Sequence, residues 1–226
     1  MRILLLCFLL LTSPFVNALG LADLSNKDAA SGLKQALTQG AGNAVATLGK
    51  ADGFMGNPKV KIPLPDSLQQ VDSLLRTFGG GKYADELVLT MNRAAEAAVP
   101  EAKALLIKSV KDMSVQDAKG ILTGGDTAAT EYFRGKTRAP LAAKFLPIVQ
   151  KATAKVGLAQ KYDQFAGKAA SYGLLDENQA NIEKYVTQKA LDGLYLMIAE
   201  EEKAIRKDPV GQASSLLSKV FGAIGR

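Results

Sequence analysis

Apolar residues recur at helical spacing along most of this chain, and this periodicity is the feature that most restricts its fold. In the segment 68–78, for example, they fall three or four positions apart, which places them on one face of a helix. Glycine, proline and capping residues stand at the ends of most such segments. Because no segment repeats another and no long linker divides the chain, we expect one all-α domain, a multi-helix bundle around a single core.

The stop and start residues place the expected helices. The main ones are a helix from the capping residues 25–28 to Leu48, then segments 66–78, 83–99, 100–113, a short helix after Ser114, 158–170, one capped by Asp176, and 187–207, with a last amphipathic segment at 210–224. Two prolines, Pro140 and Pro147, interrupt the residues between the short helix after Ser114 and the segment 158–170. There we expect one helix from Gly124 through Phe133 and another that begins at Pro140 and is kinked at Pro147.

One segment departs from the helical pattern. Residues 49–57 carry turn residues, and in residues 58–65 the apolar Val60, Ile62 and Leu64 alternate with lysine and proline. This alternation predicts an extended segment with one buried side. Its prolines remove backbone donors, so it can lie on a surface or an edge but not in the middle of a sheet. We name residues 58–65 the arm.

The first 18 residues have the order of an export signal. Arg2 provides a charged start, an apolar run follows from Ile3 to Leu11, and small residues before and at Ala18 form a cleavage site. The apolar run is shorter than the roughly 20 residues that cross a bilayer. We therefore expect cleavage near Ala18, a mature domain at 19–226, and a periplasmic or secreted location.

Composition excludes several kinds of chemistry. The only cysteine is Cys7, within the expected signal, and the chain has no histidine and no tryptophan. The mature chain therefore lacks the residues for a Ser-His-Asp triad, a Cys-His pair or a zinc site with nitrogen and sulfur ligands. The formal net charge of +6 is mild for a nucleic-acid binder. We assign no catalytic residue, no metal ligand, no cofactor and no nucleic-acid partner.

A carboxylate lies within the apolar stripe of the last long helix. Glu201 shares a face with apolar residues between 191 and 205, and we expect Glu200 and Glu202 to point away. A buried carboxylate needs a partner, because an unpaired ion costs several kcal/mol to bury. Arg93 is the candidate partner. Asn92 and Glu96 lie four positions apart, on one face of the same helix as Arg93.

A second polar group surrounds Phe133, and its members are Thr127, Thr130, Tyr132 and Arg134. The simplest interpretation is a helix cap with a solvated face. A binding role would instead place Tyr132 beside the first group. The candidate ligand-binding residues are therefore Asn92, Arg93, Glu96, Tyr132 and Glu201, and a structural clasp between helices is the alternative role for them.

The same segments resemble a family of bacterial exported proteins known as a domain of unknown function, DUF4197. The resemblance is carried by GLKQAL at 32–37, VKIPLP at 60–65, NRAAEA at 92–97, AATEYF at 128–133, YVTQKALDGL at 185–194 and IAEEE at 198–202. It spans nearly all of the expected mature chain. It implies a small helical protein of the periplasm or the exterior, and brings no activity, cofactor or catalytic residue with it.

Three hypotheses for function follow. The first is a non-catalytic envelope protein that binds a small anionic or amphipathic ligand, or a protein partner, in a cleft between helices. The second is a hydrolase or lyase that uses Glu96 and Glu201 as an acid and base pair, which requires both carboxyl groups to face one cavity. The third is association with a membrane surface through residues 210–224, for which that segment carries little basic charge.

Overall fold

The all-α prediction is confirmed in the part of the chain that the structure describes. This computed structural model describes residues 26–66, 68, 69, 72, 76, 81–154 and 181–207, and these contain no strand. The elements are α1 (Asn26–Leu48), α3 (Gly81–Ala98), the 3-10 turn η2 (Val99–Glu101), α4 (Ala102–Lys111), α5 (Val115–Thr123), α6 (Ala128–Thr153) and α8 (Ile182–Lys207). The expected signal and the predicted helices at 158–170, after Asp176 and at 210–224 lie outside the described residues.

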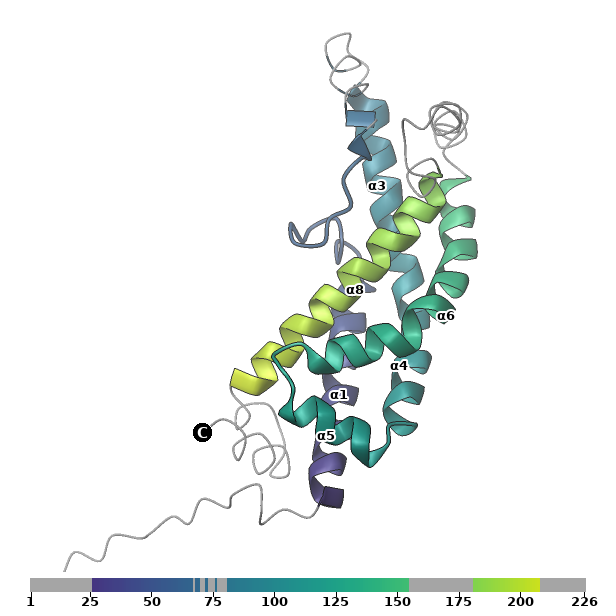
Figure 1. The fold of residues 1–226 in the computed structure, drawn as a ribbon. Helices are drawn as coiled ribbons and strands as arrows, with labels where there is room; N and C mark the ends of the chain where they lie inside the picture. Colours follow the sequence, from purple (N-terminus) through teal and green to yellow (C-terminus); the bar gives the residue numbers. More distant parts are fainter. Residues whose placement is uncertain are drawn as a thin grey trace, which may run out of the picture.

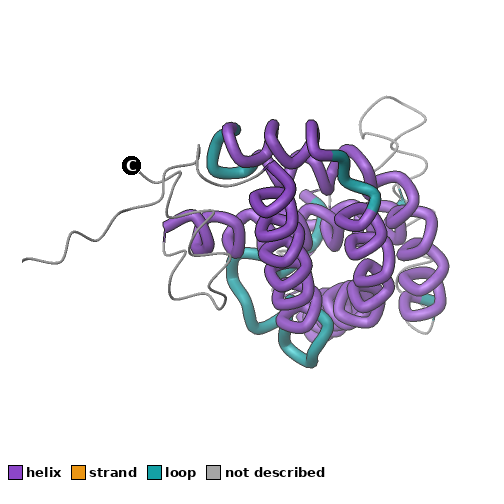
Figure 2. The backbone as a smooth tube through the Cα atoms, turned by 90° about the horizontal axis from the view of Figure 1, so that it is seen from below, coloured by secondary structure: helices purple, strands orange, loops and turns teal. Residues whose placement is uncertain are grey.

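The last described helix, α8, holds the bundle together. It crosses the molecule diagonally and packs against α6, α1 and α3 (Figure 1). In the lower part of the view in Figure 1, α1 packs against α4 and α5. Seen from below, the helices stand side by side and the loops run around them (Figure 2). Their apolar faces meet in one core, in which Phe133, Phe145 and Tyr195 are fully buried.

The prediction of a separate helix beginning at Pro140 was wrong. Residues 128–153 form one helix, α6, which contains both Pro140 and Pro147. A proline within a helix removes one hydrogen bond and crowds the preceding turn, which bends the helix. The ribbon of α6 accordingly changes direction partway along its length (Figure 1). The sequence indicated the local disturbance correctly, but packing on α3 and α8 keeps the helix continuous.

The extended arm has the side-chain pattern that its sequence predicted. Val60, Ile62 and Leu64 are buried, whereas Lys61 and Pro63 are exposed. The turns before the arm bring Phe54 onto α8, where a Cβ added to Gly193 would lie only 2.7 Å from the Phe54 ring. Gly193 therefore permits the close packing of Phe54 on α8, which fixes the turn before the arm.

The short helix α5 begins at the predicted capping residues. The Ser114 hydroxyl accepts from the Asp117 backbone N–H, and the Asp117 carboxylate accepts from the Ser114 backbone N–H. This reciprocal capping box satisfies two donors at the start of the helix. Hydrogen bonds from the Ser114 hydroxyl and, next, from its backbone N–H lower the pKa of Asp117 below its ordinary 3.8.

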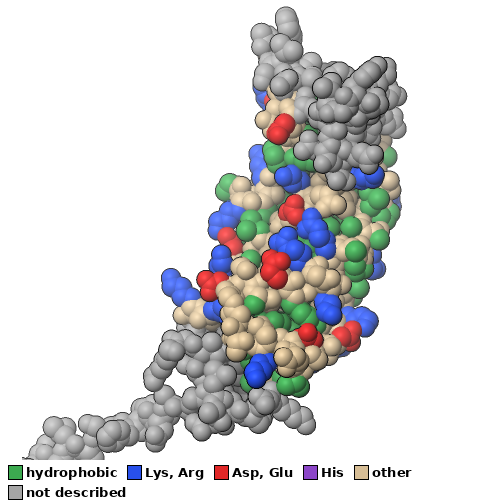
Figure 3. Space-filling view, viewed as in Figure 1, with side chains coloured by type: hydrophobic (Ala, Val, Ile, Leu, Met, Phe, Trp, Pro, Cys, Tyr) green, Lys and Arg blue, Asp and Glu red, His purple; other side chains and the backbone are tan. Residues whose placement is uncertain are grey.

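The surface charges of the bundle are mixed in sign. On the face seen in Figure 3, basic and acidic side chains are interspersed and form no broad patch of one sign. None of the described helices has both the length and the hydropathy of a membrane-spanning helix.

Candidate ligand-binding site

Asn92 binds the arm as a neighbouring strand would. Its side chain is fully buried, and its Oδ1 accepts from the backbone N–H of Ile62 at 2.8 Å. Its Nδ2 donates to the Ile62 carbonyl at 2.9 Å and to the Val88 carbonyl of α3 at 2.8 Å. One amide side chain thus satisfies both backbone groups of an extended residue that has no strand beside it.

Glu96 holds the turn that leads into the arm. Its Oε1 accepts from the backbone N–H groups of Phe54 at 3.0 Å and Met55 at 3.1 Å. Its Oε2 lies 2.6 Å from Arg93, whose guanidinium also reaches Asp52 at 2.8 Å. Hydrogen bonds to Glu96 first, and then to Asp52, raise the pKa of Arg93. Arg93 therefore pairs with these two acids, which corrects the interpretation of Arg93 as the partner of Glu201.

The other two predicted residues have their partners elsewhere. Tyr132 donates its hydroxyl proton to the Ser109 carbonyl of α4 at 2.9 Å, and burial is the main cause that raises its pKa. Glu201 accepts from Asn43 of α1 at 3.2 Å. The structure thus brings Asn92, Arg93 and Glu96 together on α3 beneath the arm segment, while Tyr132 and Glu201 each bind a different helix.

The buried carboxylate of the last helix is Glu202, and the expectation that Glu202 points away was wrong. Glu202 accepts from the backbone N–H groups of Ala129 at 3.0 Å and Thr130 at 2.9 Å, and from the Thr130 hydroxyl at 2.8 Å. Arg206, one turn later, lies 2.8 Å away. Positions 201 and 202 lie on either side of the apolar stripe, so periodicity alone could not distinguish them.

Glu202 thereby caps the start of α6. The N-cap residue Thr127 makes no capping bond with its own side chain, so the N–H groups of Ala129 and Thr130 in the first turn of α6 depend on this distant carboxylate. Thr130 is buried against Glu202, which corrects the interpretation of the polar group around Phe133 as a solvated face. Arg206 also donates to the Ile121 carbonyl near the end of α5, at 2.9 Å.

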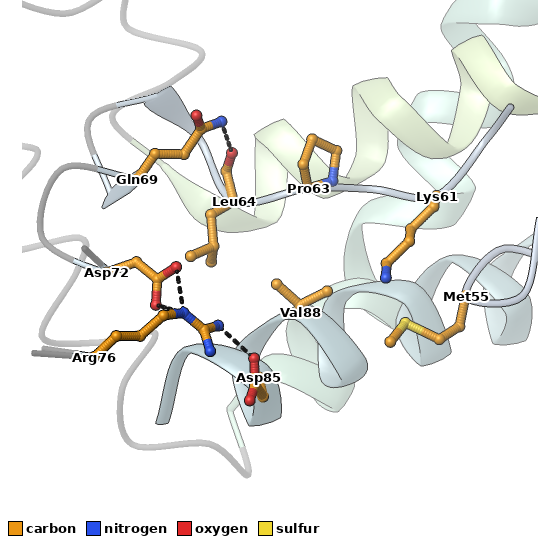
Figure 4. Close-up of a pocket in the computed structure, with 9 residues that line it drawn as sticks. All are labelled: Met55, Lys61, Pro63, Leu64, Gln69, Asp72, Arg76, Asp85 and Val88. Carbon is orange, nitrogen blue, oxygen red and sulfur yellow. Dashed lines mark hydrogen bonds and ion pairs between the residues drawn. The ribbon is translucent and has the colours of Figure 1, made fainter. Parts of the chain in front are cut away.

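A hollow of about 380 Å³ lies on the outer side of the arm. It opens between the arm, the turn at Met55, α3 and residues 69, 72 and 76, with the side chains arranged as Figure 4 shows. Four lining residues are apolar and five are polar or charged: Met55, Pro63, Leu64 and Val88, then Lys61, Gln69, Asp72, Arg76 and Asp85.

The charged groups occupy the two ends of this hollow. At one end Arg76 bridges two acids, with its Nε 2.9 Å from Asp72 and its terminal nitrogen on Asp85 (Figure 4). The hydrogen bond to Asp85, and next that to Asp72, raises the pKa of Arg76. The hydrogen bond between Arg76 and Asp85 in turn lowers the pKa of Asp85. At the other end Lys61 makes no ion pair with any described carboxylate.

None of the five predicted site residues lines this hollow. Asn92 and Glu96 instead fix its wall, because they hold Ile62, between two lining residues, and the backbone N–H of Met55. Sequence reasoning missed the lining residues because they come from three separate segments. The one available signal was Asp72 with Arg76, a pair spaced by one helical turn. Among the described residues, no group of three or more acids or cysteines is placed to hold a metal ion.

Comparison with known proteins identifies one family. The model of the family described as "Protein of unknown function (DUF4197)" matches residues 23–222. No curated protein and no solved structure matches the chain.

Proposed function

We propose that this chain, which belongs to the DUF4197 family, is a non-catalytic binding protein that holds a small anionic amphipathic molecule in the hollow beside the arm. The observation that carries the proposal is the hollow itself. Its volume of about 380 Å³ falls within the range of roughly 300–1,000 Å³ that is typical of small-molecule sites. The signal-like residues 1–18 support a location outside the cytoplasm.

The lining of the hollow suits a molecule with an apolar body. Leu64 and Val88 face each other across it, with Met55 and Pro63 beyond them (Figure 4). Covering these side chains with a ligand removes apolar surface from water, which contributes about 25 cal/mol for each Å² covered. Because Asn92 and Glu96 already fix the arm and its leading turn, the ligand does not have to order this wall when it binds.

Lys61 suits an anionic head group. Its ammonium extends from the arm over the apolar lining and has no carboxylate partner among the described residues (Figure 4). An anion that enters the hollow therefore finds a cation that no internal ion pair has to release. Arg76 is less available for this role, since Asp72 and Asp85 already occupy it.

The contacts give the hydrolase hypothesis no comparable support. A catalytic acid or base must reach the substrate, directly or through one water. Both oxygens of Glu96 are engaged, one with two backbone N–H groups and the other with Arg93. Neither Glu96 nor Glu201 lines the hollow. The membrane hypothesis depends on residues 210–224, which lie outside the described part, and it stays a prediction.

The proposal can be tested with octanoate, an eight-carbon carboxylate, titrated calorimetrically into the mature chain. We expect saturable binding that Val88→Asp abolishes, because this substitution places a carboxylate in the apolar lining. Leu89→Asp is the matched control, since Leu89 neighbours Val88 on α3 but is exposed and does not line the hollow. Circular dichroism of both variants checks that they fold. Equal octanoate binding by the two variants, or none by the unaltered chain, would contradict the proposal.

A further inference from the structure

We propose that the ligand of this hollow is a zwitterion, with an anionic group held by Lys61 and a cationic group held by Asp85 at the opposite end. This inference rests on the proposed function and adds the second charge. It follows from the different charges at the two ends of the same apolar lining.

The end formed by Asp72, Arg76 and Asp85 carries a net negative charge. Two carboxylates share a single guanidinium there, which leaves one negative charge uncompensated within the group. The side chain of Asp85 is 65% exposed, so it remains accessible beside Arg76. A ligand ammonium can therefore approach Asp85 without displacing the bond that Arg76 donates to it.

The end formed by Lys61 carries the opposite charge. Its backbone position is fixed, because Asn92 holds the next residue, Ile62, through both backbone groups. In Figure 4 the Lys61 ammonium lies on one side of Val88, and Asp85 lies on the other side together with Arg76. The hydrogen bond from Arg76 is the main cause of the lowered pKa of Asp85, and the charge of Lys61 adds a smaller effect without forming an ion pair.

This arrangement distinguishes between ligands by charge. A purely anionic molecule is attracted by Lys61 but repelled by Asp85. A purely cationic molecule is attracted by Asp85 but repelled by Lys61. A molecule with both charges on either side of a short apolar body gains at both ends. The side chain between the charges, Val88, provides no charge that would compete for the ligand (Figure 4).

The test compares three probes that share an eight-carbon body: 8-aminooctanoate, octanoate and octylammonium. Each is titrated calorimetrically into the unaltered chain and into Lys61→Gln and Asp85→Asn. We expect Asp85→Asn to weaken 8-aminooctanoate and octylammonium about fivefold, the upper range for an exposed ion pair. The same variant should leave octanoate binding unchanged or tighter. Lys61→Gln should weaken octanoate and 8-aminooctanoate and should not weaken octylammonium.

Two further variants separate the charge effect from a structural one. Asp85→Glu keeps the carboxylate and should restore 8-aminooctanoate binding. Asp192→Asn removes an exposed, paired carboxylate of α8 that does not line the hollow, and it should change nothing. If octanoate binds but Asp85→Asn does not weaken 8-aminooctanoate, or weakens octanoate as much, the zwitterion inference is wrong and the proposed function stands. If none of the probes binds the unaltered chain, both fail.

Discussion

Glu96 and Glu202 hold two distant parts of the bundle through the same kinds of contact, but the spaces beside them differ in size. Each is a buried carboxylate that accepts two backbone N–H groups from another segment and pairs with an arginine on its own helix. Near Glu202, the two cavities that it lines each measure only about 10 Å³, room for at most a single water apiece. Beside the segment that Glu96 holds, the hollow measures about 380 Å³.

The comparison shows that a buried acid and arginine pair does not by itself mark a binding site. Both pairs position backbone, as a helix cap at Glu202 and as a turn clasp at Glu96. The two differ in solvation as well, since the side chain of Arg206 is 13% exposed and that of Arg93 is 41% exposed. The hollow of the proposed function lies beside the clasp at Glu96, and the clasp fixes the turn and arm that form one of its walls.

The largest expected effect is at the more buried pair. Glu202→Ala leaves the N–H groups of Ala129 and Thr130 without their side-chain acceptor and removes the carboxylate partner of the mostly buried Arg206, so we expect a loss of about 3–5 kcal/mol in the free energy of unfolding. Urea denaturation measures it. Glu202→Gln, which keeps one acceptor oxygen, should cost less. A loss for Glu202→Ala smaller than that for Glu96→Ala would break the proposed order.

Glu96→Ala should destabilise the protein less, by about 2–3 kcal/mol. It leaves the N–H groups of Phe54 and Met55 unpaired, but Arg93 keeps Asp52 as a partner and has access to water. Hydrogen exchange should become faster at Phe54 and Met55 and stay unchanged at Ala129. Equally fast exchange at Ala129 would mean that the two ends unfold as one unit.

Gly193→Ala tests the turn that Glu96 holds, because Phe54 of this turn packs on α8 at Gly193. The added methyl would lie 2.7 Å from the ring of Phe54, and we expect a loss of about 1–3 kcal/mol from this crowding. Gly42→Ala is the matched control in α1, since nothing lies within 4 Å of an added methyl there. That control should stabilise the helix by about 0.5–1 kcal/mol. Thermal melting of both variants is the measurement, and equal losses would contradict the crowding argument.

The smallest effect is at the exposed cap of α5. The lowered pKa of Asp117 means that its carboxylate stabilises the fold fully above its ordinary pKa of 3.8 and loses that effect as the pH falls through the lowered value. Asp117→Asn should therefore be less stable than the unaltered chain at neutral pH and equal to it in strong acid. Urea denaturation at the two pH values measures the difference, and a difference that persists in acid would exclude the carboxylate as its cause.

The sequence predicted the fold better than it predicted the site, for a physical reason. Periodicity identified the described helices, apart from the division of α6 at Pro140, and alternation identified the buried side of the arm, because both depend on spacing within one segment. The choice between Glu201 and Glu202 depends on the rotation of α8 against α6, which no local pattern contains. The hollow depends on Lys61, Arg76 and Asp85 meeting from three segments, and only tertiary packing decides that.

The arm and the turn before it make contacts with α8 that can form only after α8 has been synthesised. Tyr185 donates to the Pro63 carbonyl, Lys59 pairs with Glu200, and Phe54 packs on Gly193. The arm is made early in synthesis, yet these partners emerge more than a hundred residues later. Until α8 has been made, the arm that forms one wall of the hollow lacks these partners, although α8 itself does not line the hollow.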